Sequence, residues 1–144
     1  MKTLLLASLP GLCALGLAVP PRWTPEKSAQ APGRVRVSIY RMAPGKQLDY
    51  LRWQAAQDEV AKAAGIAAPQ IYAHVDGADW DFLVVFPLTT AEQDKKMDEI
   101  AKSKGLKIGF PASLEFRELL SSHSDTLAAG PTSAAELVAA AETK

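Results

Sequence analysis

The chain has 144 residues, 48% of them hydrophobic, and its 16 basic side chains are balanced by 16 acidic ones. This balance excludes the strongly basic surface by which nucleic-acid-binding proteins attract phosphates, so we expect no nucleic-acid partner. The length allows one domain with one hydrophobic core.

The first 18 residues are typical of a secretory signal peptide. Lys2 supplies the basic start, an apolar stretch follows, and residues 16–18 (GLA) provide the small side chains of a cleavage site. A membrane anchor is disfavoured because the apolar run is interrupted by Pro10 and is shorter than the roughly 20 residues of a spanning helix. A lipoprotein modified at Cys13 is disfavoured because no small residue directly precedes that cysteine.

Cleavage after Ala18 would remove Cys13, the chain's single cysteine. The mature chain would then have no disulfide, thiol nucleophile or cysteine metal site. A small exported domain without disulfides is more typical of a bacterial periplasm than of disulfide-rich secreted modules. We therefore expect a periplasmic or secreted protein with no membrane span once the signal peptide is removed.

The first elements follow in chain order. Residues 19–33 contain four prolines and no hydrophobic periodicity, which is typical of a linker. Residues 34–42 alternate apolar and polar side chains, as a half-buried strand does, and Pro44-Gly45 predicts a turn. Residues 46–64 are rich in helix formers and end before Gly65, a typical helix C-cap. The apolar arc of this helix includes Leu48, Leu51, Ala55, Ala56, Val60 and Ala63.

The nine residues HVDGADWDF, 74–82, lie between two runs rich in β-branched and aromatic side chains. Because a short polar link containing glycine joins these runs, residues 70–86 predict a β-hairpin. A capping box then opens a helix, either with Thr89 and Glu92 or with Thr90 and Gln93. This helix is expected to end near Ser103.

The segment SLEFRELLS, residues 113–121, fits either a strand or a short helix by its composition. We assign it as a strand, because the preceding β-α-β-β-α order otherwise lacks its closing strand. Ser133 and Glu136 form another capping box, which begins an alanine-rich tail helix within residues 128–144 that is marginal alone. The pattern predicts an α+β domain over 34–127, ferredoxin-like β-α-β-β-α-β, with one antiparallel four-stranded sheet and both helices on one face.

Such a sheet leaves one face bare, and this implies a partner. A first strand ending in YRMAPGK and the later stretch YAHVDGADWDFLVVFPLTTAEQD resemble the dimeric α/β-barrel superfamily, nearest to small NIPSNAP-like and antibiotic-biosynthesis-monooxygenase-like domains. The resemblance covers about residues 34–121. It implies a homodimer in which two sheets face each other across a two-fold axis, and it brings no catalytic motif.

The acidic hairpin does not have the composition of a metal site. Asp76, Asp79 and Asp81 are too few and wrongly spaced for a calcium loop, and they are expected to cap turns. His74 has only His123 as a second histidine for zinc. We therefore expect no metal and no cofactor.

The sequence SHSDT, residues 122–126, contains the three residue types of a hydrolase triad. We reject a triad, because adjacent residues cannot direct their side chains at one another in the required order. His123 and Asp125 could still join a site in a loop after the final strand.

The candidate ligand site is one face of the sheet. If Val35, Val37 and Ile39 face the helices, the opposite face presents polar side chains. These are Arg36, Ser38, Tyr40, Tyr72, His74 and, if the register of the last strand agrees, Arg117. This set suits an anionic or aromatic small molecule, and His74 can act as a general base. The same residues can instead form a polar network across a dimer interface without a ligand.

We expect an exported homodimeric module that binds a small ligand or another protein. The alternative is a cofactor-independent oxygenase or isomerase that acts on a small aromatic or acidic molecule in the barrel cavity. A third hypothesis is a structural part of an envelope complex, in which the tail helix docks a partner. The sequence leaves open whether the protein is an enzyme.

Overall fold

The computed structural model of the protein describes residues 33–143. The predicted signal peptide, and the predicted linker up to Pro32, lie outside these residues. Within the described part of the chain, no helix is both long enough and apolar enough to cross a membrane.

One antiparallel sheet of four strands, in the order β2-β3-β1-β4, forms the centre of the domain. The strands are β1 (Gly33–Met42), β2 (Gln70–Ala73), β3 (Phe82–Pro87) and β4 (Leu120–Gly130). Strand β1 lies in the middle, pairing with β3 on one side and with β4 on the other. This topology confirms the α+β, ferredoxin-like fold class expected from the sequence.

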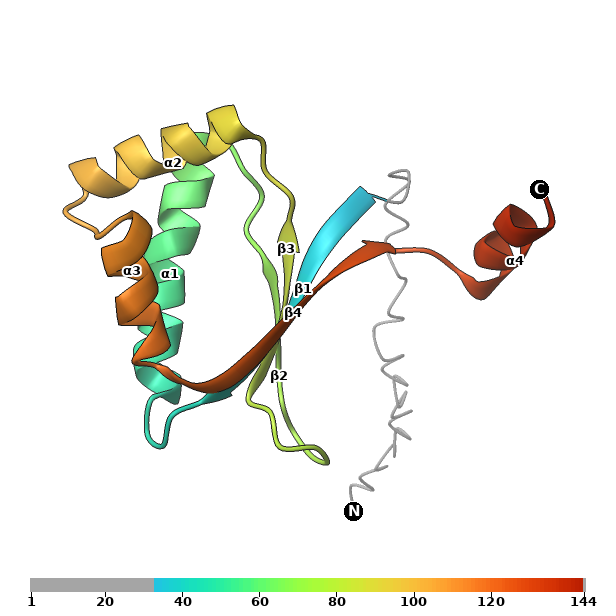
Figure 1. The fold of residues 1–144 in the computed structure, drawn as a ribbon, viewed down its shortest axis with the longest axis horizontal. Helices are drawn as coiled ribbons and strands as arrows, with labels where there is room; N and C mark the ends of the chain where they lie inside the picture. Colours follow the sequence, from blue (N-terminus) through green and yellow to red (C-terminus); the bar gives the residue numbers. More distant parts are fainter. Residues whose placement is uncertain (1–32, 144) are drawn as a thin grey trace, which may run out of the picture.

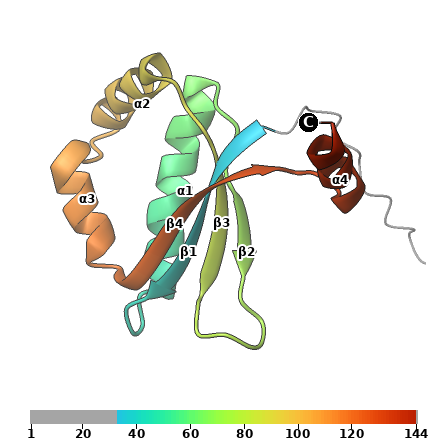
Figure 2. The same cartoon turned by 45° about the vertical axis from the view of Figure 1, so that its right-hand side comes forward.

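Most of the described helices lie on one side of this sheet. Three of them, α1 (Gln47–Ala64), α2 (Ala91–Ser103) and α3 (Gly109–Arg117), form a layer on one side (Figure 1). The fourth, α4 (Ala134–Glu142), stands apart on the other side, beyond the end of β4 (Figure 2). The second sheet face is therefore not covered by the helical layer.

The expected helix signals are confirmed in detail. Helix α1 ends at Gly65, whose φ of 81° is the left-handed conformation that glycine tolerates best. Helix α2 begins with the second of the two possible capping boxes: Gln93 N donates to Thr90 Oγ1 at 3.3 Å, and Thr90 N donates to Gln93 Oε1 at 2.9 Å. Ser133 and Glu136 form the same reciprocal box at the start of α4.

The assignment of residues 113–121 as a strand is wrong. Residues 109–117 form α3, and the closing strand β4 follows at 120–130. Pro111 is in the first turn of α3, where its missing N–H has no helical partner to lose. Strand β4 has no clear apolar alternation of its own, and its position is defined by pairing with β1 along nearly its whole length.

The expected orientation of the sheet faces is also wrong. Tyr40 is buried against Tyr50 of α1, whereas Ile39, on the other face of β1, is 38% exposed. Tyr40 lies opposite Phe82 in the β1–β3 register, so both aromatic rings are on the helix side. Alternation identifies two faces of a strand, but the aromatic side chains decide which one is covered, because they bury the larger area.

The burial of an aromatic side chain also decides which face of α1 packs against the sheet. Leu48 and Leu51, which belong to the predicted apolar arc, are exposed, whereas Tyr50 and Gln54 are buried. The hydrophobic core consists of Tyr40, Met42, Tyr50, Phe82, Val84 and Leu119. It is centred between α1 and the middle strands, and α2 and α3 extend beyond it.

Candidate functional site

The structure divides the six residues of the predicted site among several places. Three of them, Arg36, Ser38 and Tyr40, lie together on the helix side of β1. The other three are an exposed Tyr72 on the bare face of β2, His74 in the link from β2 to β3, and an exposed Arg117 at the end of α3. The single polar sheet face expected from the sequence is therefore not formed.

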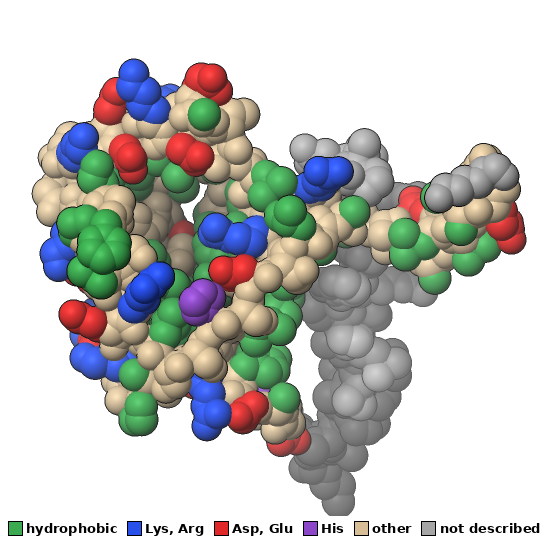
Figure 3. All heavy atoms as spheres, viewed as in Figure 1, with side chains coloured by type: hydrophobic (Ala, Val, Ile, Leu, Met, Phe, Trp, Pro, Cys, Tyr) green, Lys and Arg blue, Asp and Glu red, His purple; other side chains and the backbone are tan. Residues whose placement is uncertain are grey.

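A cavity of about 570 Å³ lies between the sheet and the three helices that cover it. Figure 3 shows the molecular surface hollowed there, between the helical layer and β4. Its lining includes Arg36, Tyr40, Trp53, Phe86 and Phe116. Its volume is in the range of small-molecule sites, so this cavity is the candidate functional site.

Aromatic rings form one wall of the cavity. The Trp53 ring of α1 stacks on Phe116 of α3, with centroids 4.9 Å apart and an interplanar angle of 28°. Tyr40 meets the same Phe116 ring edge-on at 5.5 Å. Sequence reasoning missed Trp53 and Phe116, although Trp53 follows Tyr50 by three residues, the spacing of one helix face. This wall can stack on a flat apolar group of a ligand.

Arg36 is held along the sheet side of the cavity. Its guanidinium carbon lies 4.5 Å from the centre of the Phe86 ring, a cation–π contact made by a residue that is exposed as a whole. Among the described residues Arg36 forms no ion pair with a carboxylate. A positioned arginine without a carboxylate partner can bind a ligand carboxylate through two parallel hydrogen bonds.

The acidic side chains around the cavity mostly have partners within the protein. The contacts are Gln54 Nε2 to Asp58 Oδ1 (2.8 Å), Thr89 Oγ1 to Asp94 Oδ1 (2.5 Å) and His123 Nε2 to Asp125 Oδ2 (3.7 Å). Each contact places a hydrogen-bond donor against a carboxylate that would otherwise accept from a ligand. The cavity is therefore poorer in free acceptors than its aspartates suggest.

In contrast to these carboxylates, buried hydrogen-bond donors in and beside the cavity lack acceptors within the described part of the chain. The indole N–H of Trp53 is buried and has no acceptor among the described residues. The hydroxyl of Ser38, which lies beside the cavity and is fully buried between Arg36 and Tyr40 on β1, also makes no well-formed hydrogen bond there. An unmade hydrogen bond to a buried donor costs about 1–3 kcal/mol, so a ligand that supplies an acceptor to Trp53 gains that energy.

Tyr40 adds a neutral donor. Burial raises the pKa of Tyr40 above its usual value of 10.0; the charge of Asp125 adds to the rise, while contact with the Ser38 hydroxyl and the charge of Arg36 oppose it. The Tyr40 hydroxyl therefore keeps its proton at neutral pH and is available to donate it in a hydrogen bond.

His123 and Asp125 lie on β4 itself and not in a loop after the last strand. Both face the helix side, where His123 is opposite Tyr40 and Asp125 is opposite Ser38 in the β1–β4 register. The His123 ring is 6.3 Å from that of Tyr40 and 6.4 Å from that of Phe116. Residues two apart in a strand share a face, so the sequence does contain a signal that His123 and Asp125 lie together. The signal goes unused because the last strand is predicted at 113–121.

The structure separates His74 from the cavity. Its ring lies 4.9 Å from that of Trp80, beside an open depression that Arg41 and Asp79 also line. The Nε2 atom of His74 is buried without a hydrogen-bond partner among the described residues. His74 is therefore not placed to act on a molecule held between the helices and the sheet.

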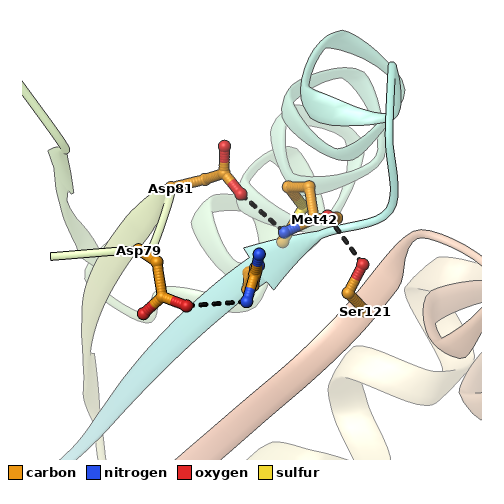
Figure 4. Close-up of polar contacts among 5 residues, drawn as sticks. Met42, Asp79, Asp81 and Ser121 are labelled. Carbon is orange, nitrogen blue, oxygen red and sulfur yellow. Dashed lines mark hydrogen bonds and ion pairs between the residues drawn. The ribbon is translucent and has the colours of Figure 1, made fainter.

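The aspartates of the acidic hairpin hold the end of β1 (Figure 4). Asp81 Oδ2 accepts a hydrogen bond from Met42 N at 2.7 Å, and Asp79 pairs with Arg41 at 2.6 Å. From the opposite side, Ser121 Oγ donates to the carbonyl of Met42 at 3.0 Å. The described residues contain no group of three or more side chains suited to hold a metal ion.

Replacing Asp81 by alanine should lower the free energy of unfolding by about 1–3 kcal/mol, because the Met42 N–H loses its acceptor in a part-buried position. Urea unfolding measures this change. Asp76→Ala is the matched control, since Asp76 is exposed in the same link, and it should stay within about 0.5 kcal/mol of wild type. Equal losses in the two variants would show that the Asp81 contact has no structural importance.

Comparisons with known proteins add two similar structures. No family model matches this chain, and no curated protein matches it in sequence. The protein Atu4242 from Agrobacterium tumefaciens is 13% identical, with a TM-score of 0.45 over 69% of this chain and 93% of that one. A dimeric ferredoxin-like protein from an uncultured marine organism is 14% identical, with a TM-score of 0.42 over 71% of this chain and 90% of that one.

Proposed function

We propose that this protein is an exported homodimeric module that binds a small carboxylate with an aromatic or apolar body in the cavity between helices and sheet. One observation carries the choice of ligand: among the described residues the Trp53 indole N–H has no acceptor and Arg36 has no carboxylate partner, while most of the cavity's carboxylates already have donors. A ligand rich in acceptors complements this arrangement, and a cation does not.

The proposed ligand has a defined orientation. Its carboxylate lies against the Arg36 guanidinium, which is in cation–π contact with the Phe86 ring. Its apolar part lies on the wall formed by Trp53 and Phe116. The cavity of about 570 Å³ is large enough for a molecule of one or two rings.

The homodimer is supported by the composition of the bare sheet face. Its centre consists of the apolar side chains Val35, Val37, Ile39, Leu83 and Val85. The charged side chain of β1 on this face, Arg41, is paired with Asp79. Contiguous apolar surface of this kind is rarely left in water, and a second copy can cover it symmetrically. The resemblance to dimeric α/β-barrel domains agrees with this arrangement, and the signal-like residues 1–18 support export.

The proposed function is tested with paired ligands that differ only in charge. Benzoate, phenylacetate and indole-3-acetate are compared with benzylamine and phenethylamine by thermal shift and calorimetry. Carboxylates should raise the unfolding temperature and the amines should not. Arg36→Ala should weaken carboxylate binding by about ten-fold to a hundred-fold, since a hydrogen bond to a charged group contributes about 1.5–3 kcal/mol.

Arg41→Ala is the matched control, because it removes an arginine on the other face of the same strand and should leave affinity unchanged. Trp53→Phe keeps the stacking ring and removes the N–H, so it should weaken binding less than Arg36→Ala does. Equal binding of carboxylates and amines, or equal effects of Arg36→Ala and Arg41→Ala, would refute the proposed site.

A cofactor-independent oxygenase or isomerase is the second candidate function. It is favoured by His123, whose ring lies 6.3 Å from that of Tyr40 at the cavity wall and which has the Asp125 carboxylate at 3.7 Å, an arrangement suited to a general base. Incubating a bound carboxylate with the protein in air separates the two functions. Oxygen uptake or an isomeric product indicates an enzyme, whereas an unchanged ligand indicates a binding module.

A further inference from the structure

Helix α4 is an apolar helix without a visible partner. It stands beyond the end of β4, on the side of the sheet opposite to α1, α2 and α3 (Figures 1 and 2). Leu137 and Val138 are 59% and 54% exposed, and the rest of the helix is mostly alanine. The side-chain hydrogen bonds of α4 within the described chain all stay between residues 132 and 143.

Such a helix needs packing to be stable. An isolated helix shorter than about 12–15 residues is marginal in water even when it is rich in alanine. Its capping box and its alanines favour helix formation, but they do not bury Leu137 or Val138. The surface that stabilises α4 therefore lies outside the described part of its own domain.

The chain that leads into α4 is anchored in the sheet by strand pairing. Strand β4 pairs with β1 up to Gly130, which lies opposite Gly33 at the beginning of β1. The C-terminal arm, residues 131–143, therefore starts from an ordered ladder and projects to the bare side of the sheet (Figure 2). A second copy that covers the bare face would lie within reach of this arm.

The area of the bare sheet face also indicates that a second copy needs contacts beyond this face. At about 4.8 Å between strands and about 3.3 Å per residue, these four strands of 4 to 11 residues cover about 500 Å². A stable interface buries about 800 Å² on each partner. The sheet face by itself is thus small for a stable homodimer. An apolar arm on the same side of each copy supplies additional contact area.

We propose that the C-terminal arm is exchanged between two copies of this chain, with the Leu137 and Val138 side of α4 packed on the second copy at the margin of its bare sheet face. This inference rests on the proposed homodimer, and it adds a second contact that the sheet faces do not provide. Each copy gives one arm and receives one, as a two-fold axis requires.

Sedimentation equilibrium of the chain and its variants over a concentration series tests the arm. The double variant Leu137→Glu, Val138→Glu should raise the dimer dissociation constant by about ten-fold or more, since it places charges in an apolar contact. Deletion of residues 132–144 should have the same effect without depending on how α4 folds. Leu48→Glu is the matched control, because Leu48 is 55% exposed on α1 and should leave dimerisation unchanged.

Hydrogen exchange shows whether α4 is packed only when the dimer forms. The amides of α4 should be protected at concentrations where the dimer forms, and should exchange freely when it is diluted to the monomer. A wild-type chain that stays monomeric would refute the homodimer itself. A dimer whose dissociation constant ignores both arm variants, or an α4 that stays protected in the monomer, would refute the exchange alone.

Discussion

Replacing Tyr50 by alanine should lower the free energy of unfolding by about 3–5 kcal/mol, the range for removing a large aromatic ring from a core. Tyr50 is 0% exposed, and its ring centre lies 5.5 Å from that of Tyr40 and 5.1 Å from that of Phe82. Tyr50 packs α1 against β1 and β3 in the core, so its removal leaves a cavity between the helix and the sheet. The loss is a large share of the 5–15 kcal/mol typical of a domain and should be evident in urea unfolding.

The control for this prediction is Phe110→Ala. Phe110 also carries an aromatic ring but is 70% exposed on α3, so its removal should cost no more than about 0.5 kcal/mol. If both variants lost the same stability, the aromatic cluster around Tyr50 would not be the core of the domain.

The pH dependence of stability provides a second readout for Tyr50. Burial raises the pKa of Tyr50 above the ordinary 10.0, as it does for Tyr40. Above about pH 10 the unfolded chain releases the tyrosine protons while the folded chain keeps them, so the stability present below pH 10 is lost as pH rises. Tyr50→Phe removes one of these protons, and its stability should fall less steeply than that of wild type above pH 10.

Ile39→Glu should convert the proposed homodimer to a monomer, with a dissociation constant raised by about a hundred-fold or more, because each copy would place an unpaired carboxylate in the apolar centre of the interface. Ile39 is 38% exposed on the bare face, so the substitution adds a charge where the isolated domain already meets water. Light scattering after size exclusion, together with sedimentation, measures the change in mass.

Val75→Glu is the control, because Val75 is 94% exposed in the link after β2 and lies outside the bare face. Circular dichroism must show that the Ile39 variant keeps its fold; if it does not, Tyr72→Glu, on the edge strand β2 beyond β3, tests the same face. A wild-type dimer that neither substitution weakens would mean that the copies associate through another surface.

The candidate site was predicted in part. The alternation of residues 34–42 selected Arg36 and Tyr40, which do line the cavity, but assigned them to the wrong side of the sheet. Trp53 and Phe116 were missed as site residues because each becomes part of the cavity only when α1 and α3 pack over the sheet. His123 and Asp125 were misplaced together with the strand that carries them.

The sequence by itself determined the elements whose signals are local. Alternation located β1, capping boxes located the starts of α2 and α4, and Gly65 located the end of α1, because these signals act within one strand or one helical turn. The order of these elements then sufficed for the ferredoxin-like fold class.

Only the tertiary structure decided the position of β4, the face of the sheet that the helices cover, and the cavity between them. Strand β4 exists because it pairs with β1, from which it is separated by most of the domain, and no local pattern reports that pairing. The covered face follows from a competition between the aromatic set around Tyr40 and the aliphatic set around Ile39, which is settled by what Tyr50 and Phe82 present from elsewhere in the chain.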